Sequence, residues 1–210
     1  MGIISRIFEA GEKKIIDRSV AIIDIAIKSN RILGEIIKKS ERSGAIRSLD
    51  NKADSESFAL SNLIISGAIA PNLINSMITL VHREEEIVDS IFNLSRHLLR
   101  YELKSREYAR YMGKNLEEMN LLADSAIKLL HKMHETDDIR KLKGLRHRIK
   151  ALENDGDVIK DAMLDFAYSS RAGFKDFYFI IDAAYLSDDI LDSCEDASDI
   201  FISIMTSIIT

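Results

Sequence analysis

The sequence has very little of what loop-rich or cross-linked folds require. Its 210 residues include one Cys, one Pro, nine Gly and no Trp. A single cysteine excludes an internal disulfide framework and agrees with a reducing compartment. So few turn-forming residues argue against a β-sandwich, whose many short strands need frequent turns. The rest of the chain is 46% hydrophobic and 30% charged, a composition typical of an all-α helical bundle.

Long apolar runs are also scarce. Residues 57–81 carry no charge, but Pro71 divides this stretch and several Ser, Asn and Thr residues interrupt it, so we do not expect a membrane span. The apolar part of the N-terminus ends at Arg6 and is too short for a secretory signal. These features predict a cytoplasmic protein. The uncharged stretch gives rise to one hypothesis, that it forms a bundle tip which docks on a membrane transporter.

Several classes of function lack their sequence signals. The net charge of −5 disfavours nucleic-acid binding, because nucleic-acid-binding proteins usually present a basic surface. No glycine-rich phosphate loop and no Ser/His/Asp set is found in the sequence. We therefore predict that the chain is not an enzyme.

Apolar residues recur with helical spacing along nearly the whole chain. Pro71 should separate the second helix from the third, because the residue before a proline disfavours helical geometry. The conformation of residues 101–113, which join the third helix to the fourth, is not decided by the pattern. The predicted helices cover residues 3–40, 46–70, 72–98, 116–133, 139–170 and 174–208.

The second half of the chain repeats the first at a shift of 103 residues. Leu49-Asp-Asn-Lys-Ala-Asp54 aligns with Leu152-Glu-Asn-Asp-Gly-Asp157, and residues 85–90 align with residues 188–193 without a gap. A duplicated unit of three helices explains this match. We expect two tandem three-helix bundles, residues 1–104 and 105–210, which together form one domain.

Each repeat carries two pairs of acidic residues at a spacing of four. Residues four apart lie on one helix face, where like charges cost about 0.2–0.5 kcal/mol per pair unless they are neutralised. If the second and third helices of each repeat form an antiparallel hairpin, the two pairs meet at one level. The candidate ligands are Asp50, Asp54, Glu85 and Asp89 in the first half and Glu153, Asp157, Asp188 and Asp192 in the second.

Such a set of oxygen ligands suits hard cations such as Mg²⁺ and Ca²⁺, and also Fe and Mn, as single ions or as a multinuclear cluster. The alternative is that the acids form a solvated face. With 34 acidic residues in the chain, acidic pairs at this spacing also arise from composition alone. We favour the metal site because four pairs occupy matched positions of a repeat.

These motifs and their order along residues 5–208 resemble the PhoU-like family, and within it the branch of phosphate transport regulators that are accessory to Pit-type transporters. The resemblance implies two three-helix bundles, acidic clusters that hold iron, zinc or other metals, a cytoplasmic location and a regulatory role. It implies the eight carboxylates above as ligands. Asp50 and Asp188 stand where the family often has Glu. A Pit-type transporter or a signalling partner would be contacted, while peripheral membrane association and self-association remain open.

Two rival functions belong to other classes. A di-iron carboxylate enzyme of ferritin type needs Glu-x-x-His motifs, but the residues three before the five histidines are Thr, Leu, Lys, His and Gly. A helical adaptor without metal would use its acidic residues only for solubility. Metal analysis separates the adaptor from the regulator.

Overall fold

All six predicted helices are present in the computed structural model, which describes residues 10–38, 45–67, 69–136 and 138–209. No strand occurs within these ranges, so the all-α prediction is confirmed. A short 3₁₀ turn, η2, lies before the third helix. The elements are α1 (Ala10–Ile37), α2 (Ala45–Ile65), η2 (Pro71–Leu73), α3 (Ile74–Arg100), α4 (Arg106–His134), α5 (Ile139–Ser169) and α6 (Phe174–Ile209).

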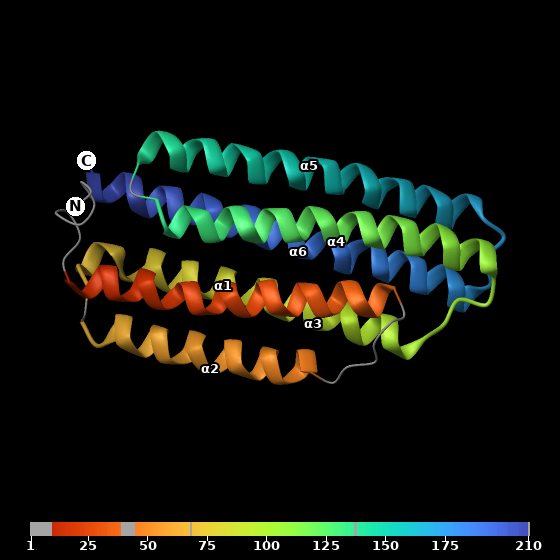
Figure 1. Ribbon diagram of the computed structural model, residues 1–210, viewed down its shortest axis with the longest axis horizontal. Helices are drawn as coiled ribbons and strands as arrows, with labels where there is room; N and C mark the ends of the chain where they lie inside the picture. Colours follow the sequence, from red (N-terminus) through yellow and green to blue (C-terminus); the bar gives the residue numbers. More distant parts are fainter. Residues whose placement is uncertain (1–9, 39–44, 68, 137, 210) are drawn as a thin grey trace.

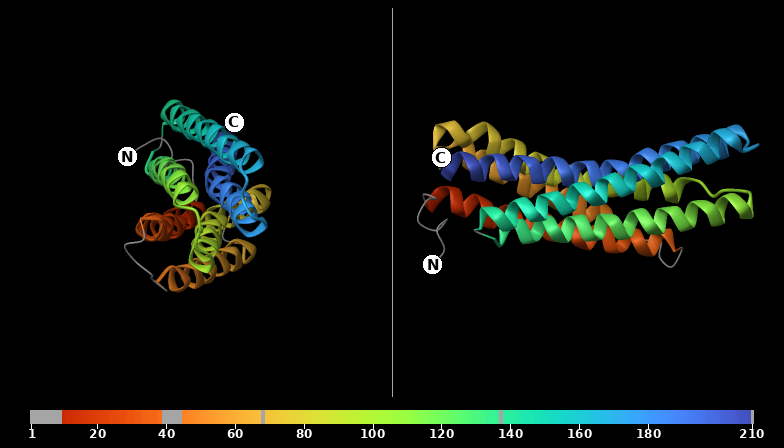
Figure 2. Two further views of the ribbon diagram at one scale, coloured as in Figure 1. Left: turned by 90° about the vertical axis from the view of Figure 1, so that its right-hand side faces the viewer. Right: turned by 90° about the horizontal axis from the view of Figure 1, so that it is seen from above.

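The helices form one elongated bundle (Figure 1). α2 and α5 form its two outer edges, and α1, α3, α4 and α6 lie between them, as the end-on view of Figure 2 also shows. The α2–α3 turn and the α5–α6 turn lie at opposite ends of the bundle (Figure 1). The two groups of three helices therefore run in opposite directions.

A continuous hydrophobic core joins the two groups. The most extensive helix pairing is between α3 and α6, one from each group. α1 and α4 are linked by reciprocal amide hydrogen bonds, in which Asn120 Nδ2 donates to Asn30 Oδ1 at 2.8 Å and Asn30 Nδ2 donates to the Asn120 carbonyl at 3.2 Å. Buried amides that satisfy one another in this way fix how two helices align.

The main differences from the predicted helices lie at their ends. α2 ends at Ile65, five residues earlier than predicted, and the turn that follows uses Gly67 at φ 87°, a conformation that favours glycine. The undecided region after the third helix is split between a short linker and α4. Ser105 caps α4 by accepting a hydrogen bond from the Tyr108 amide at 3.4 Å.

The uncharged stretch 57–81 lies partly in the core and partly on the surface, where Phe58 and Ile65 are 71% and 65% exposed. Leu60, Ile64, Leu73 and Met77 are buried, with Leu73 only 5% exposed. Because Leu73 is buried, Leu73→Asp would place a carboxylate in the core and destabilise the bundle. No helix within the described ranges is long and apolar enough to cross a membrane.

Candidate functional site

The first acidic cluster lies between α2 and α3. Asp50 and Asp54 come from α2, and Glu85 and Asp89 come from α3, which pack together as the predicted hairpin. Burial and the charges of Asp54 and Asp89 raise the pKa of Asp50 to about 6, although Arg96 and Arg47 oppose this rise. Within the described ranges, no ion pair joins any of the four carboxylates to a basic side chain.

Glu85 carries the most perturbed carboxyl group of this cluster. Burial, a hydrogen bond with Asp54 and the charges of Asp54, Asp89 and Asp50 raise the pKa of Glu85 to about 7. Burial and the repulsion among the four carboxylates thus favour the protonated form of Glu85. A cation bound among these carboxylates would lower the repulsion.

The second acidic cluster, between α5 and α6, contains a basic side chain. Lys160 Nζ forms ion pairs with Asp157 on α5 and, at 2.5 Å, with Asp188 Oδ2 on α6. Although burial lowers the pKa of Lys160, hydrogen bonds to both carboxylates hold it above its ordinary value. Burial raises the pKa of Asp188 despite the opposing charge of Lys160. This ammonium occupies the space between two of the four predicted ligands.

The other two predicted ligands of the second half, Glu153 and Asp192, have different surroundings. Glu153 is buried and forms an ion pair with Lys150 at 2.9 Å, and Lys150 also contacts Glu195 Oε2 at 3.0 Å. Asp192 is exposed as a whole residue, but its carboxyl group is partly buried. This burial, together with the charge of Asp188, raises the pKa of Asp192 to about 6. The four-carboxylate arrangement is thus present without paired cations in the first half only.

The small residue that precedes the second aspartate of each α2 and α5 motif has a packing role. A Cβ atom added to Gly156 would lie 2.3 Å from Leu191 Cδ1, so a larger residue there would require the Leu191 side chain to shift. Ala53, its counterpart in α2, is fully buried. Close approach of the helices is what brings carboxylates on neighbouring helices to the same level.

Neither cluster is a finished metal site. Among the described residues, no group of three or more His, Cys, Asp or Glu side chains is arranged to hold a metal ion as it stands. In the first cluster, however, Asp54 and Asp89 are exposed, and Asp89 accepts a hydrogen bond only from Asn93 Nδ2, at 3.2 Å, among the described residues. Their oxygen atoms, the absence of ion pairs with them among the described residues and the raised pKa of Glu85 fit a hard cation. The second cluster does not fit one, because Lys160 already neutralises it.

Sequence reasoning missed two features. Lys160 stands where the first half has Ser57, and this difference between the repeats was a readable signal. The second is a fully buried ion pair between Glu84 of α3 and His134 of α4, with a contact of 2.8 Å between Glu84 Oε1 and His134 Nε2. The apolar residues around Glu84 were only a weak sign that its side chain is buried, since the residues that follow it directly in the sequence are also acidic.

A separate cavity of about 440 Å³ lies between α1, α3, α4 and α6. None of the eight predicted ligands lines it. Its walls combine apolar residues, among them Ile36, Leu98, Met112 and Phe179, with the polar residues Arg100, Tyr101 and Glu102.

Comparison with known proteins supports the architecture. No family model and no curated protein matches the sequence. A solved structure that matches the fold is that of a "putative PhoU-like phosphate regulatory protein" from Shewanella oneidensis MR-1, with a TM-score of 0.57 and 13% sequence identity over 94% of this chain and 98% of that one. At this identity the likeness concerns the fold, which is PhoU-like and all-helical.

Proposed function

We propose that this chain is a metal-binding regulatory protein of inorganic phosphate transport and has no catalytic activity. The phosphate assignment is supported by the shared fold with the Shewanella protein, whose name describes a phosphate regulatory protein. The metal assignment rests on one observation, which is that Asp50, Asp54, Glu85 and Asp89 share a half-buried site without ion-paired lysine or arginine among the described residues. Fe, Mn, Zn, Mg²⁺ and Ca²⁺ are all candidate ions.

A bound cation would act on the α2–α3 hairpin. It would neutralise the repulsion that now raises the pKa values of Asp50 and Glu85, and it would displace the proton from Glu85. The same carboxylates would then hold α2 firmly against α3.

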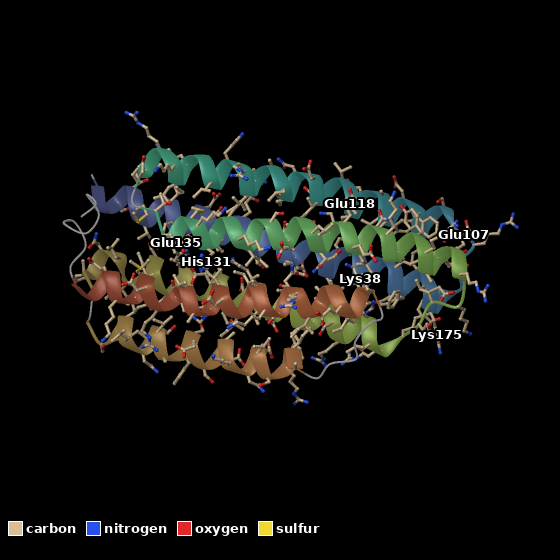
Figure 3. The ribbon with its side chains drawn as sticks, in the orientation of Figure 1. Lys38, Glu107, Glu118, His131, Glu135 and Lys175 are labelled. Atoms are coloured by element: carbon tan, nitrogen blue, oxygen red, sulfur yellow. The ribbon has the colours of Figure 1, made fainter. Side chains whose placement is uncertain are left out.

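The surface that we propose for contact with a membrane transporter is the end of the bundle formed by the α5–α6 turn. Tyr168, Phe174 and Tyr178 are 74%, 79% and 55% exposed, and Arg171 and Lys175 beside them are exposed as well. Figure 3 labels Lys175 at this end of the molecule. Exposed aromatic rings with basic neighbours suit the boundary between a transporter and anionic lipid headgroups.

Metal analysis of protein purified without chelator tests the first part of the proposal. The wild type should carry metal, and Asp54→Asn/Asp89→Asn should lose it. The matched control is Glu117→Gln/Glu118→Gln, which removes two exposed acids on α4 outside the cluster and should leave the metal content unchanged. Equal metal loss in both double variants, or no metal in any of them, would overturn the assignment.

Phosphate uptake by vesicles that contain a Pit-type transporter tests the second part. Wild-type protein added to the face that binds it should change the uptake rate, and Phe174→Ser/Tyr178→Ser should not. Unchanged uptake with wild-type protein, loaded with metal or freed from it, would overturn the transporter role.

The helical adaptor is the second candidate function. It is favoured by the exposed aromatic rings at the α5–α6 end and by the lack of a finished metal site in the described part of the chain. An adaptor would bind its partner through these rings equally well with and without metal. A chelator that leaves partner binding unchanged would therefore favour the adaptor over the metal-dependent regulator.

A further inference from the structure

The second acidic cluster holds a cation that belongs to the protein itself. Lys160 is only 17% exposed, and its Nζ atom contacts one carboxylate on its own helix and one, 5% exposed, on α6. These two partners, Asp157 and Asp188, correspond to Asp54 and Glu85 of the first half at the 103-residue shift. The ammonium therefore lies at the pair of carboxylates that corresponds to the hydrogen-bonded pair of the first cluster.

The first half has no equivalent of this lysine. The position that corresponds to Lys160 is Ser57, which is 3% exposed and uncharged. Both residues follow their aspartate by three positions and so lie on the same helix face as that aspartate. A single substitution between the repeats thus separates a cluster with an internal cation from a cluster without one.

We infer that the Lys160 ammonium takes the place of a metal ion in the second half, so that the chain binds metal through its first half alone. An ammonium and a metal ion compete for the same carboxylate oxygens. A metal ion could enter only if Lys160 moved away from its two partners. The displaced ammonium would stay charged and close to the metal ion, and the repulsion between the two cations opposes this. Lys160 is therefore the residue that decides which half takes metal, and this inference rests on the proposed metal binding of the first half.

The buried position of Asp188 explains why a cation is needed there. Its carboxylate is nearly inaccessible, and Asp188 Oδ1 has no hydrogen-bond partner among the described residues. Removal of the lysine leaves this carboxylate without its charged partner, and an added metal ion is the simplest replacement. Lys160→Ser, which copies the first half, should therefore create a second metal site.

Equilibrium dialysis against Mn²⁺ tests the inference in the Asp54→Asn/Asp89→Asn background, where the first cluster is disabled. Adding Lys160→Ser to this background should restore Mn²⁺ binding, with at least tenfold higher affinity than the background itself. Lys160→Arg keeps a cation in place and should restore nothing. The melting temperature of the Lys160→Ser variant should fall without Mn²⁺ and rise again when Mn²⁺ is added, which also shows that the variant folds.

The Mn²⁺ experiment distinguishes a failure of this inference from a failure of the proposed function. If wild-type protein binds no Mn²⁺ but Lys160→Ser gains it, the inference about Lys160 stands while metal binding by the first half falls. If Lys160→Ser binds no more Mn²⁺ than its background, or if wild-type protein binds Mn²⁺ that only Asp157→Asn/Asp188→Asn removes, the inference is overturned.

The reciprocal exchange gives a second test. Ser57→Lys in the wild-type chain should weaken Mn²⁺ binding at least tenfold, because the introduced ammonium would pair with Asp54 and Glu85. Ser57→Met adds a side chain of similar length without charge and should keep Mn²⁺ binding within a few-fold of wild type. Tight Mn²⁺ binding by folded Ser57→Lys protein would contradict the inference.

Discussion

The two acidic clusters occupy equivalent hairpins, but their carboxylates are neutralised in different ways. Between α2 and α3 burial and repulsion favour the protonated form of Glu85 and raise its pKa to about 7. Between α5 and α6 the repulsion is relieved by Lys160, which contacts Asp157 and Asp188. A proton is exchanged for a metal ion easily, whereas a tethered lysine is not. Matched positions of acidic residues therefore do not guarantee matched chemistry.

The halves also differ at the centre of the bundle. Glu84 of α3 is fully buried, and the corresponding residue of α6 is Ser187. Neither oxygen of Glu84 has a hydrogen bond of good geometry among the described residues, so the charge of Glu84 depends on its short contact with His134. The His134 ring also packs against Phe201 of α6 at 4.5 Å. The buried Glu84 of the first half is thus paired with His134 of α4, and the position of that histidine is supported by Phe201 of α6.

Breaking this central pair should give the largest effect. His134→Leu leaves Glu84 as an uncompensated buried carboxylate and should lower the free energy of unfolding by about 3–5 kcal/mol. Glu84→Leu leaves a neutral imidazole and should cost less. Urea denaturation at pH 7 measures both changes.

The double variant Glu84→Leu/His134→Leu is the control for this prediction. Since both polar partners are removed together, it should be more stable than His134→Leu. Burial lowers the pKa of His134, but Glu84 and the Leu130 carbonyl outweigh burial and raise it. The contribution of the pair is therefore complete below pH 6.5, the ordinary value, and is lost as pH rises through the raised pKa. A double variant no more stable than His134→Leu would show that packing, and not charge, dominates.

Removing the internal cation of the second cluster should have the next largest effect. Lys160→Met without metal should cost about 2 kcal/mol, because Asp188 loses its charged partner in a buried setting. Lys128→Met is the matched control: the Lys128 side chain is 55% exposed and its partner Asp124 is 34% exposed, so its loss should cost about 1 kcal/mol or less. Thermal unfolding in the presence of a chelator measures the two. Equal costs would remove the distinction drawn between the two lysines.

The first cluster should make stability depend on pH in the opposite way to a salt bridge. The pKa values of Asp50 and Glu85 rise from 3.8 to about 6 and from 4.5 to about 7, so the folded state binds more protons than the unfolded state between these values. The contribution of these two groups to the free energy of unfolding is complete near pH 4 and is lost as pH rises to about 8. The loss should amount to about 1–2 kcal/mol after allowance for solvent screening.

The variant Asp50→Asn/Glu85→Gln isolates this contribution, because neither substituted side chain titrates and the variant should not lose stability between pH 4 and pH 8 for this reason. Urea denaturation of the wild type and the variant between pH 4 and pH 8, both without metal, gives the difference. Bound metal should also remove the fall in the wild type. A variant with the same pH dependence as the wild type would mean that the four carboxylates of α2 and α3 do not interact as described.

The helices and the pairing of the hairpins could be predicted from sequence, because both depend on local rules. Apolar periodicity indicated six helices, and similar distances from Pro71 placed the pair Asp50 and Asp54 at the level of the pair Glu85 and Asp89. The opposite directions of the two halves and the pairing of Glu84 with His134 could not be predicted, since they depend on long-range packing of α3 and α4. Lys160 was visible in the repeat, but its contact with α6 depends on the distance between helices, which Gly156 permits.

The smallest effect is expected at the surface link between the halves. Arg83 of α3 contacts Glu86 at 2.5 Å and Asp196 of α6 at 3.6 Å, with all three side chains 40–54% exposed. Arg83→Ala should cost less than about 1 kcal/mol, and the cost should shrink further in 1 M salt. Urea denaturation at low and high salt checks both statements. A cost above 2 kcal/mol that persists in salt would show that the α3–α6 interface depends on surface charge. The expectation that buried ion pairs contribute more to stability than exposed ones, on which the ranking of these effects rests, would then be wrong.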